Sequence, residues 1–298
     1  MPYIKFLQDE NNKLKAQLKA ENDVMMFPPG HYYSPIFSIH EIKKHEQRIW
    51  KEKLPDVIPG IYLNTNYQLQ LIRDLSEYFS EMPFMAQPQN ELRFYFENDY
   101  YSYTDGIILY SMIRYFKPKR LIEVGSGFSS ALMMDTNEQF FDGAIHLEFI
   151  EPNPKRLYSL FKESDKATIK VTEDLVQHIP VSKFQELENG DILFIDSSHV
   201  AKTGSDLNYI LFEILPSLNK GVLIHFHDIF YPFEYPKEWV YGGRNWNENY
   251  ILRAYLMNSD SYKIIYFSDF MHKKHPDSFT NMPLCYKNTG GALWLEKI

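Results

Sequence analysis

The sequence contains very little cysteine and no long apolar run. Cys285 is the single cysteine among 298 residues, so no disulfide can form within the chain, which suits a reducing compartment. No segment approaches the roughly 20 apolar residues that cross a bilayer. The charged N-terminal segment lacks the apolar core of a secretory signal peptide. We therefore expect a cytoplasmic protein without a membrane span.

Positive charge is also scarce. The chain carries 31 Lys+Arg against 39 Asp+Glu, a formal net charge of −8, and no dense basic cluster appears. Nucleic-acid-binding surfaces are typically basic, so nucleic acid is not an expected partner. Aromatic residues are abundant instead, at 16%. Their abundance predicts a large core and favours an aromatic-lined pocket.

Residues 1–95 are predicted to form an N-terminal helical extension. Apolar residues recur every three or four positions over 3–21, which predicts an amphipathic helix. This helix either pairs with a second copy in a homodimer or packs weakly on its own chain. Residues 27–38 read FPPGHYYSPIFS, in which proline and glycine exclude a helix and the rings predict an ordered loop. Further helices are predicted over 40–53 and 66–80.

Residues 96–298 are predicted to form a second, α/β domain. Short apolar runs alternate with helical stretches, which predicts a Rossmann-like, mostly parallel sheet with helices on both faces. No helical pattern separates the last two runs, so these are expected to pair antiparallel. The predicted strands are 120–125, 145–151, 167–174, 191–198, 221–228, 262–269 and 291–297. The predicted helices are 104–116, capped by Thr104, and 129–136, 154–163, 204–218 and 247–257.

A glycine-rich turn follows the first predicted strand and opens a helix. It reads Glu123-Val-Gly-Ser-Gly, so that Gly125, Ser126 and Gly127 form the turn. Glycines permit a sharp turn and the close approach of a ligand to the main chain, and ligands of open α/β sheets bind at the carboxyl ends of the strands. A dinucleotide fingerprint would need glycine where Ser130 stands, which argues against a nicotinamide cofactor.

Acidic residues end the next two predicted strands. Glu151 ends the second strand, where a carboxylate accepts hydrogen bonds from both hydroxyls of a ribose. Glu173 and Asp174 end the third strand, where a carboxylate can accept a hydrogen bond from the amino group of an adenine. A glycine turn followed by two acidic strand ends indicates a nucleoside-containing cofactor.

With these features, the chain resembles the class I S-adenosylmethionine-dependent methyltransferases over roughly residues 100–298. The resemblance rests on EVGSGFSS (123–130), IEP (150–152) and the terminal strand pair. It implies a seven-stranded sheet in the order 3-2-1-4-5-7-6. It also implies that the glycine turn binds the methionine part of S-adenosylmethionine, Glu151 its ribose and Asp174 its adenine.

Carboxylates and imidazoles follow the fourth and fifth predicted strands. Asp196 and His199 come after the fourth, and His227 and Asp228 end the fifth. Because neighbouring strands end at one edge, this set suits Mg²⁺ or Mn²⁺, although two carboxylates sharing a proton is an alternative. His225 lies on the same strand face as His227. Which of the two faces the site stays open, and we leave His225 out of the metal ligands.

This arrangement is similar to that of metal-dependent sugar O-methyltransferases of natural-product and surface-glycan pathways, and of the cephalosporin-hydroxylase-like group. The resemblance implies that Asp196 and Asp228 hold Mg²⁺, that His227 replaces a usual acid, and that His199 is the general base. Resemblance to methyltransferases of cell-surface glycan clusters further implies that His31 or Tyr33 lies over the cofactor.

A loop rich in aromatic residues, proline and glycine follows the fifth strand, over residues 231–250. Long irregular loops at an active face are usually functional. Arg244, Asn245 and Trp246 can hydrogen-bond to and stack on a polar ring, so we predict that they bind substrate. The alternative is a packed lid that never touches substrate.

The sequence therefore predicts a metal-assisted, S-adenosylmethionine-dependent O-methyltransferase acting on a hydroxyl of a sugar or glycan-type small molecule. Several alternatives stay open. One is a related S-adenosylmethionine- and metal-binding enzyme with hydroxylase-like or N-methyltransferase chemistry. The others are an NAD-dependent oxidoreductase and a non-catalytic scaffold.

Overall fold

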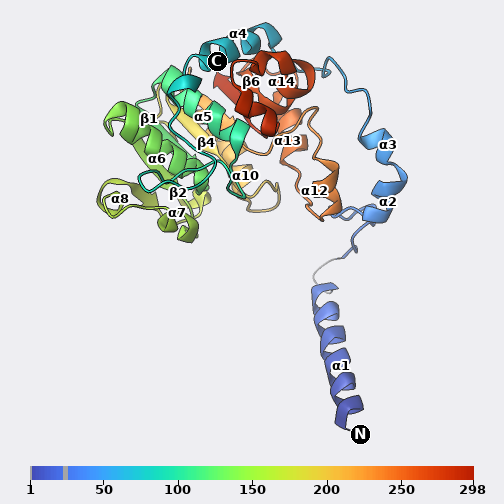
Figure 1. Cartoon of the computed structure of the whole chain (residues 1–298). Helices are drawn as coiled ribbons and strands as arrows, with labels where there is room; N and C mark the ends of the chain where they lie inside the picture. The colour runs from blue at the N-terminus through green and yellow to red at the C-terminus, as the bar shows by residue number, and fades with distance from the viewer. Residues whose placement is uncertain (1, 23–25) are drawn as a thin grey trace. The chain divides into compact units, whose positions relative to one another are not determined.

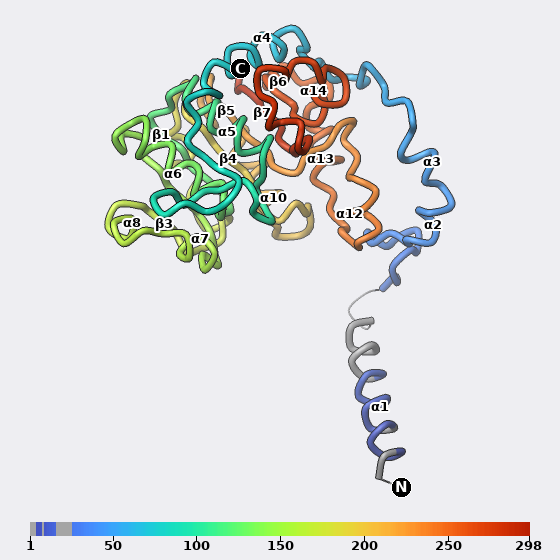
Figure 2. The backbone as a smooth tube through the Cα atoms, in the orientation of Figure 1, coloured from blue at the N-terminus to red at the C-terminus, as the bar shows by residue number. Residues whose placement is uncertain are grey.

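A computed structural model describes residues 2–22 and 26–298 of the chain (Figure 1), and Figure 2 traces the path of its backbone. The chain divides into two compact units. The first comprises Met1–Lys53 and Pro236–Asn245, and the second comprises Leu54–Tyr235 and Trp246–Ile298. The predicted boundary between residues 95 and 96 lies inside the second unit, because the segment before it packs on the sheet. Gln68, for example, accepts a hydrogen bond from the backbone N–H of Phe267 at 2.7 Å.

The second unit is built on a seven-stranded sheet in the order β3-β2-β1-β4-β5-β7-β6, which confirms the predicted topology (Figure 1). All neighbouring pairs are parallel except those made by β7, which runs antiparallel to both β5 and β6. The central strands are apolar because helices cover both faces. The strands are β1 (Arg120–Val124), β2 (His146–Ile150), β3 (Lys170–Thr172), β4 (Ile192–Ile195), β5 (Leu223–Phe226), β6 (Tyr262–Phe267) and β7 (Leu293–Lys297).

The strand register brings the carboxyl ends of the parallel strands to one edge. Val124 is the register partner of both Ile150 and Ile195, and Ile195 is the partner of Phe226. The residues that follow these four positions therefore begin their loops side by side. They are Gly125, Glu151, Asp196 and His227.

Helices of the second unit pack on the sheet and on one another. α5 and α6 lie side by side in Figure 1, and α4 packs against α5 and the edge strand β6. The helices are α4 (Thr65–Ser76), η1 (Phe79–Glu81), α5 (Tyr103–Phe116), α6 (Phe128–Phe141), α7 (Lys155–Ser159), α8 (Asp165–Thr168), η2 (Val176–His178), α9 (Val181–Phe184), α10 (Asp206–Tyr209), the π-helical η3 (Ile210–Ile214), α11 (Leu215–Ser217), α13 (Glu248–Leu256), α14 (Ser268–Lys274), η4 (Pro276–Phe279) and η5 (Pro283–Lys287).

Two local predictions are wrong. α14 follows β6 directly, although no helical pattern was expected between the last two strands. Its first four residues are buried, so it lacks the polar face that reveals a surface helix. Thr104 does not cap α5, which begins at Tyr103. Its hydroxyl instead donates to the backbone oxygen of Asn288 at 2.6 Å and is buried.

The first unit contains α1 (Pro2–Asn22), α2 (Ile39–Lys44), α3 (Glu46–Ile49) and α12 (Lys237–Tyr241). The helix predicted over 40–53 is interrupted at His45, whose φ of −117° and ψ of 13° are not helical. Glu46 ties the two parts of this unit together, because it accepts from Lys237 at 2.8 Å and from Tyr241 at 2.6 Å. In the described ranges, no helix is both long and apolar enough to cross a bilayer.

Candidate active site

The turn between β1 and α6 exposes main chain without side chains at the carboxyl ends of the strands. Gly125 has a φ of +90°, and a Cβ atom at this position would lie 1.9 Å from the carbonyl oxygen of Asp196. Only glycine fits this close approach of two loops. The next glycine, Gly127, is the N-cap of α6, and its N–H donates to the hydroxyl of Ser130 at 3.0 Å. Ser130 thus supports the turn where a dinucleotide fingerprint has glycine.

Glu123 lies beneath this turn and is fully buried. Its two carboxyl oxygens accept from the hydroxyls of Ser129 and Ser130, each at 2.5 Å. Burial raises the pKa of Glu123 to about 8, against the effect of these two hydrogen bonds. The carboxyl therefore holds the start of α6 against β1 rather than presenting a free charge to a ligand.

Residues 93–102 form an arch that packs against the β1–α6 turn. At its base Arg93 is buried and pairs with Asp135 at 2.6 Å, with Asp165 at 2.5 Å and with Glu138 at 3.0 Å. At its end, the Tyr100 ring stacks on Phe128, the first residue of α6, with ring centroids 6.2 Å apart. Three carboxylates thus fix the position of the arch beside the glycine turn.

Tyr101, at the end of the arch, was missed by the sequence analysis. Its side chain is buried, and its ring centroid lies 5.1 Å from that of His227 and 6.1 Å from that of Phe194. Burial raises its pKa well above the ordinary value, and the charges of Asp105 and Asp196 add to the effect. The hydroxyl is therefore neutral and can donate a hydrogen bond.

Several buried polar atoms at this edge have no hydrogen-bond partner among the described residues. Buried polar groups normally find a partner, because leaving one unpaired costs about 1–3 kcal/mol. A group of such atoms on neighbouring loops is therefore suited to bind the polar groups of a ligand. The atoms are Tyr101 Oη, Ser126 Oγ after β1, Ser197 Oγ after β4 and His227 Nδ1 after β5.

His199 lies between carboxylates from three loops. Its Nδ1 is 2.7 Å from Glu248 Oε2, and its Nε2 is 3.4 Å from Asp196 Oδ1 and 3.7 Å from Asp228 Oδ2. Burial acts to lower the pKa of His199, but Asp196 and Glu248 outweigh it and hold the pKa well above the ordinary value. Burial raises the pKa of Glu248, against the effect of His199. The proton of the pair resides on the imidazole.

The backbone of His199 is fixed as firmly as its side chain. Its φ is +59°, in the left-handed region that side chains rarely occupy. The N–H groups of Asn247 and Glu248 both donate to its carbonyl oxygen, at 3.1 and 3.2 Å. Trp246 covers the imidazole with ring centroids 4.3 Å apart. The start of α13 thus orients His199.

The predicted metal ligands Asp196, His227 and Asp228 lie together beside His199, and their binding of a metal ion stays a prediction. No group of three His, Cys, Asp or Glu side chains in residues 2–22 and 26–298 is placed to hold a metal ion. Asp196 and Asp228 both face His199, and His227 Nε2 lies 3.5 Å from Asp228 Oδ1. Burial acts to raise the pKa of Asp196, but His227 and His199 lower it to about 2. The protonated imidazole of His199 therefore supplies positive charge next to Asp196 and Asp228, the role that the sequence analysis gave to a metal cation.

Comparison with known proteins identifies the family. Residues 122–229, from β1 to the residue after Asp228, match the model of a methyltransferase domain. A curated protein of Archaeoglobus fulgidus, described as uncharacterized, is 31% identical over 172 residues, which cover 56% of this chain and 76% of that protein. The chain belongs to the class I S-adenosylmethionine-dependent methyltransferases.

Two solved structures of methyltransferases are similar to the chain. The SAH-bound Podospora anserina methyltransferase is 14% identical with a TM-score of 0.43, over 92% of this chain and 99% of that one. The O-methyltransferase TomG of Streptomyces achromogenes, involved in tomaymycin synthesis and solved with SAM, is 11% identical with a TM-score of 0.41, over 87% and 95%.

In the methyltransferase, the other predicted cofactor residues of the sheet lie at strand ends. Glu151 follows β2, and its Oε1 accepts from the N–H of Asn153 at 2.8 Å. Asp174 is exposed and pairs with His178 at 2.7 Å, and this pairing is the first cause that lowers its pKa. Their contacts to ribose and adenine stay predictions.

His225 of the methyltransferase belongs to the core. Its ring stacks on Phe194 at a centroid distance of 3.8 Å and meets Trp294 edge-on at 4.9 Å. Burial lowers the pKa of His225 well below the ordinary value, so the ring is neutral. His227, two residues later, is the histidine at the site.

Four predicted ligand-binding residues lie in the first unit. His31 stacks on Phe27 with centroids 4.6 Å apart, and the N–H of Tyr33 donates to His31 Nδ1 at 3.2 Å. Arg244 lies over the Trp239 ring at 4.1 Å, and Asn245 donates to the backbone oxygen of Gly243 at 2.8 Å. Their contacts to cofactor and substrate stay predictions.

Two glycines in the loop before β7 pack against Asp105 and Asp228. Gly290 has a φ of +65°, and a Cβ atom there would lie 2.6 Å from Asp105 Oδ1. The N–H of Gly291 donates to the same oxygen at 2.9 Å, and a Cβ atom on Gly291 would lie 3.1 Å from the Cα of Asp228. The loop before β7 thus supports Asp228 with backbone alone.

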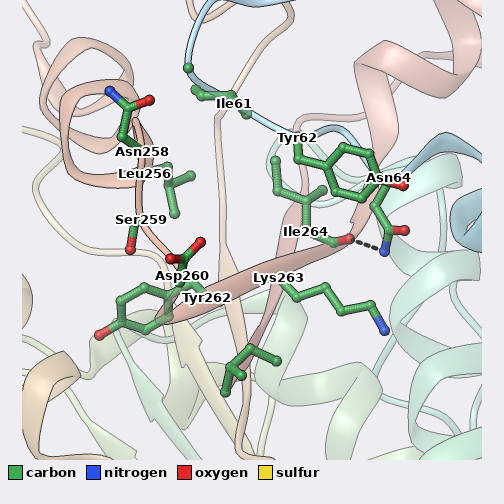
Figure 3. A pocket seen from close by; sticks show the side chains of 12 residues that line it. Ile61, Tyr62, Asn64, Leu256, Asn258, Ser259, Asp260, Tyr262, Lys263 and Ile264 are labelled. Carbon is green, nitrogen blue, oxygen red and sulfur yellow. Dashed lines mark hydrogen bonds between the residues drawn. The ribbon is translucent and has the colours of Figure 1, made fainter.

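A groove of about 640 Å³ lies at the opposite edge of the sheet, where β6 begins (Figure 3). Two of its polar side chains, Asn64 and Lys263, have partners within the chain. Asn64 Nδ2 donates to the carbonyl oxygen of Ile264 at 3.0 Å, and Lys263 pairs with Glu296 at 3.7 Å. The groove is therefore separate from the cluster around His199.

Proposed function

We propose that the methyltransferase transfers a methyl group to a hydroxyl oxygen of a sugar or glycan-type small molecule, with His199 as the general base. The arrangement of His199 carries this proposal. Glu248 holds the ring nitrogen Nδ1. The other ring nitrogen, Nε2, faces the edge of the sheet where the glycine turn follows β1. A histidine fixed in this way is suited to accept a proton from a hydroxyl.

Bound S-adenosylmethionine supplies an electrophilic methyl group, and the chain supplies position and proton transfer. The orphaned hydroxyls of Tyr101, Ser126 and Ser197 fit the polar groups of this cofactor, and Gly125 lets it approach the backbone. His199 Nε2 takes the proton of the acceptor hydroxyl as the oxygen attacks the methyl carbon. Asp196 and Asp228 then stabilise the imidazolium. Much of the acceleration comes from alignment of the two reactants.

The charge of His199 predicts when the base is active. In the free protein, the carboxylates keep the imidazole protonated. A second positive charge, the sulfonium of the cofactor, disfavours the imidazolium and lowers the pKa. Proton acceptance then begins once the cofactor is in place.

The acceptor class is proposed from the groups around His199. The Trp246 ring lies over the imidazole, and the Tyr235 ring lies 6.1 Å from that of Trp246. Aromatic faces with carboxylates beside them suit a sugar, whose C–H face packs on rings and whose hydroxyls donate to carboxylates. The proposal includes no metal step, because His199 already neutralises Asp196 and Asp228.

The test is a methyl-transfer assay on the purified full chain with a panel of hydroxyl acceptors and matched amine acceptors. His199→Ala is expected to lower kcat at least about 100-fold, while titration with S-adenosylhomocysteine shows an unchanged Kd. His146→Ala, which removes an exposed histidine at the start of β2, is the control. Near-full turnover of His199→Ala overturns the assignment of the base, and transfer only to amines overturns O-methylation.

A metal arm completes this test. Assays run with a chelator and with added Mg²⁺ are expected to give the same rate. A strict requirement for Mg²⁺ would show that Asp196 and Asp228 rearrange to bind it, as the resemblance to sugar O-methyltransferases implies.

A further inference from the structure

α1 carries an apolar stripe that no described part of its own unit covers. Ile4, Leu7 and Leu14 lie on it, with 50%, 48% and 55% of their surface exposed. The spacing places Ile4 at an a position and Leu7 and Leu14 at d positions of a heptad repeat, with Asn11 at the second a position. Leu18 continues the repeat in the sequence, and its side chain lies outside the described ones.

A helix of this kind is stabilised mainly by packing. Most helical stability in proteins comes from burying an apolar face rather than from the helix alone. The described side chains of α1 are all exposed. Its helical state therefore calls for a partner that covers the stripe.

We propose that α1 pairs in parallel with α1 of a second copy of this chain, so that the methyltransferase is a coiled-coil dimer. Asn11 favours this occupant, because an asparagine at an a position fixes register and oligomer state by pairing with its symmetry mate. A partner of another sequence would have to supply a matching amide at that level. A second copy supplies it by symmetry.

The charges beside the stripe agree with a parallel pair. Glu10 occupies a g position and Lys15 the following e position. In a parallel dimer, Glu10 of each copy faces Lys15 of the other, which gives two attractive pairs. In an antiparallel pair, g positions of one helix face g positions of the other, and e positions face e positions. Both Glu10–Lys15 pairs are then lost.

The oligomeric state tests the dimer. The full chain of 35.4 kDa is run through size exclusion with light scattering over a dilution series. A mass of two chains is expected, and Leu14→Glu is expected to give one chain. Lys13→Glu, a charge change at an outward-facing c position, is the control and keeps the dimer. A wild-type protein that is monomeric throughout, or a Leu14→Glu variant that stays dimeric, overturns the proposal.

Two further variants test the orientation. Glu10→Lys and Lys15→Glu are each expected to weaken self-association about tenfold, since each converts two attractive pairs into repulsive ones. Mixed together, these two variants form attractive pairs in both directions and are expected to associate. Leu14→Cys is expected to cross-link copies under oxidation and Lys13→Cys is not, while the native Cys285 is buried. An Lys13→Cys cross-link without a Leu14→Cys one contradicts parallel pairing.

This proposal is independent of the proposed reaction. α1 lies in the first unit, whereas His199 and its partners lie in the second. Cofactor titration of the Leu14→Glu variant distinguishes the dimer proposal from the proposed reaction. A variant that loses the dimer but still binds the cofactor shows that α1 is needed for association and not for cofactor binding.

Discussion

Replacement of Glu248 by glutamine tests the mechanism most directly. Glu248 is buried and lies 2.7 Å from His199 Nδ1, so it both orients the ring and stabilises its positive charge. Glutamine keeps the shape of the side chain and removes the negative charge. Two effects are expected, one on the rate and one on its pH dependence.

The size of the pH effect follows from the geometry. At an effective dielectric constant of about 20, a unit charge about 4 Å away is worth about 4 kcal/mol, or about 3 pKa units. Asp196 and Asp228 remain in the variant, so this is an upper bound. A base must be deprotonated to act, so activity of the wild type rises as pH increases through a pKa above 6.5. In Glu248→Gln this rise is expected at lower pH, by about one to three units.

The plateau rate falls in the same variant, because the ring loses its fixed tautomer and orientation. A loss of about 10²–10⁴ in kcat/KM is expected, the usual contribution of a positioned acid or base. The assay is kcat/KM for methyl transfer as a function of pH. Glu234→Gln is the control, because Glu234 bonds to Tyr250 and not to His199. An unchanged plateau with an unmoved pH rise refutes the role of Glu248.

Three further substitutions test the arch and the turn. Tyr101→Phe is expected to weaken S-adenosylhomocysteine binding about 3- to 10-fold by titration without lowering the melting temperature, because the lost hydroxyl is unpaired in the free protein. Glu123 has its folded pKa raised from 4.5 to about 8, so its contribution to stability is complete below 4.5 and is lost as pH rises through 8. Glu123→Gln is expected to flatten that decline in a thermal-shift series, and an unchanged decline would contradict the raised pKa. Arg93→Met removes the cation that faces the buried Asp135 and Asp165 and is expected to cost about 3–5 kcal/mol, or about 10 °C in melting temperature by calorimetry; a loss under 1 °C would show that the arch is not anchored there.

The sheet and the glycine turn could be predicted because their determinants are local. Most strands are short and largely apolar, and the turn can be recognised by two glycines close to an acidic residue. Parallel neighbours end at one edge, so the approach of Asp196 and Asp228 also followed from the topology. The helix α14 was missed because its buried residues show no amphipathic period.

The partners of His199 could not be predicted, because they depend on non-local packing. Glu248 lies 49 residues from His199, and nothing in the sequence indicates that the start of α13 contacts the loop after β4. Tyr101 was missed for the same reason, since its position depends on Arg93 reaching carboxylates in α6 and α8. The metal was inferred from Asp196, His227 and Asp228 at neighbouring strand ends, and the sequence did not show that His199 also lies within 4 Å of both carboxylates.

The two glycines in the loop before β7 bear on how acceptor specificity can diverge among relatives. Exposed loops tolerate insertions, so under the proposed function the loop of residues 231–250 is the place where acceptor preference is expected to change. The loop before β7 has less freedom, because a Cβ atom at Gly290 would lie 2.6 Å from Asp105 Oδ1 and a Cβ atom at Gly291 would lie 3.1 Å from the Cα of Asp228. Libraries aimed at new acceptors should therefore diversify residues 231–250 and leave residues 290–291 invariant.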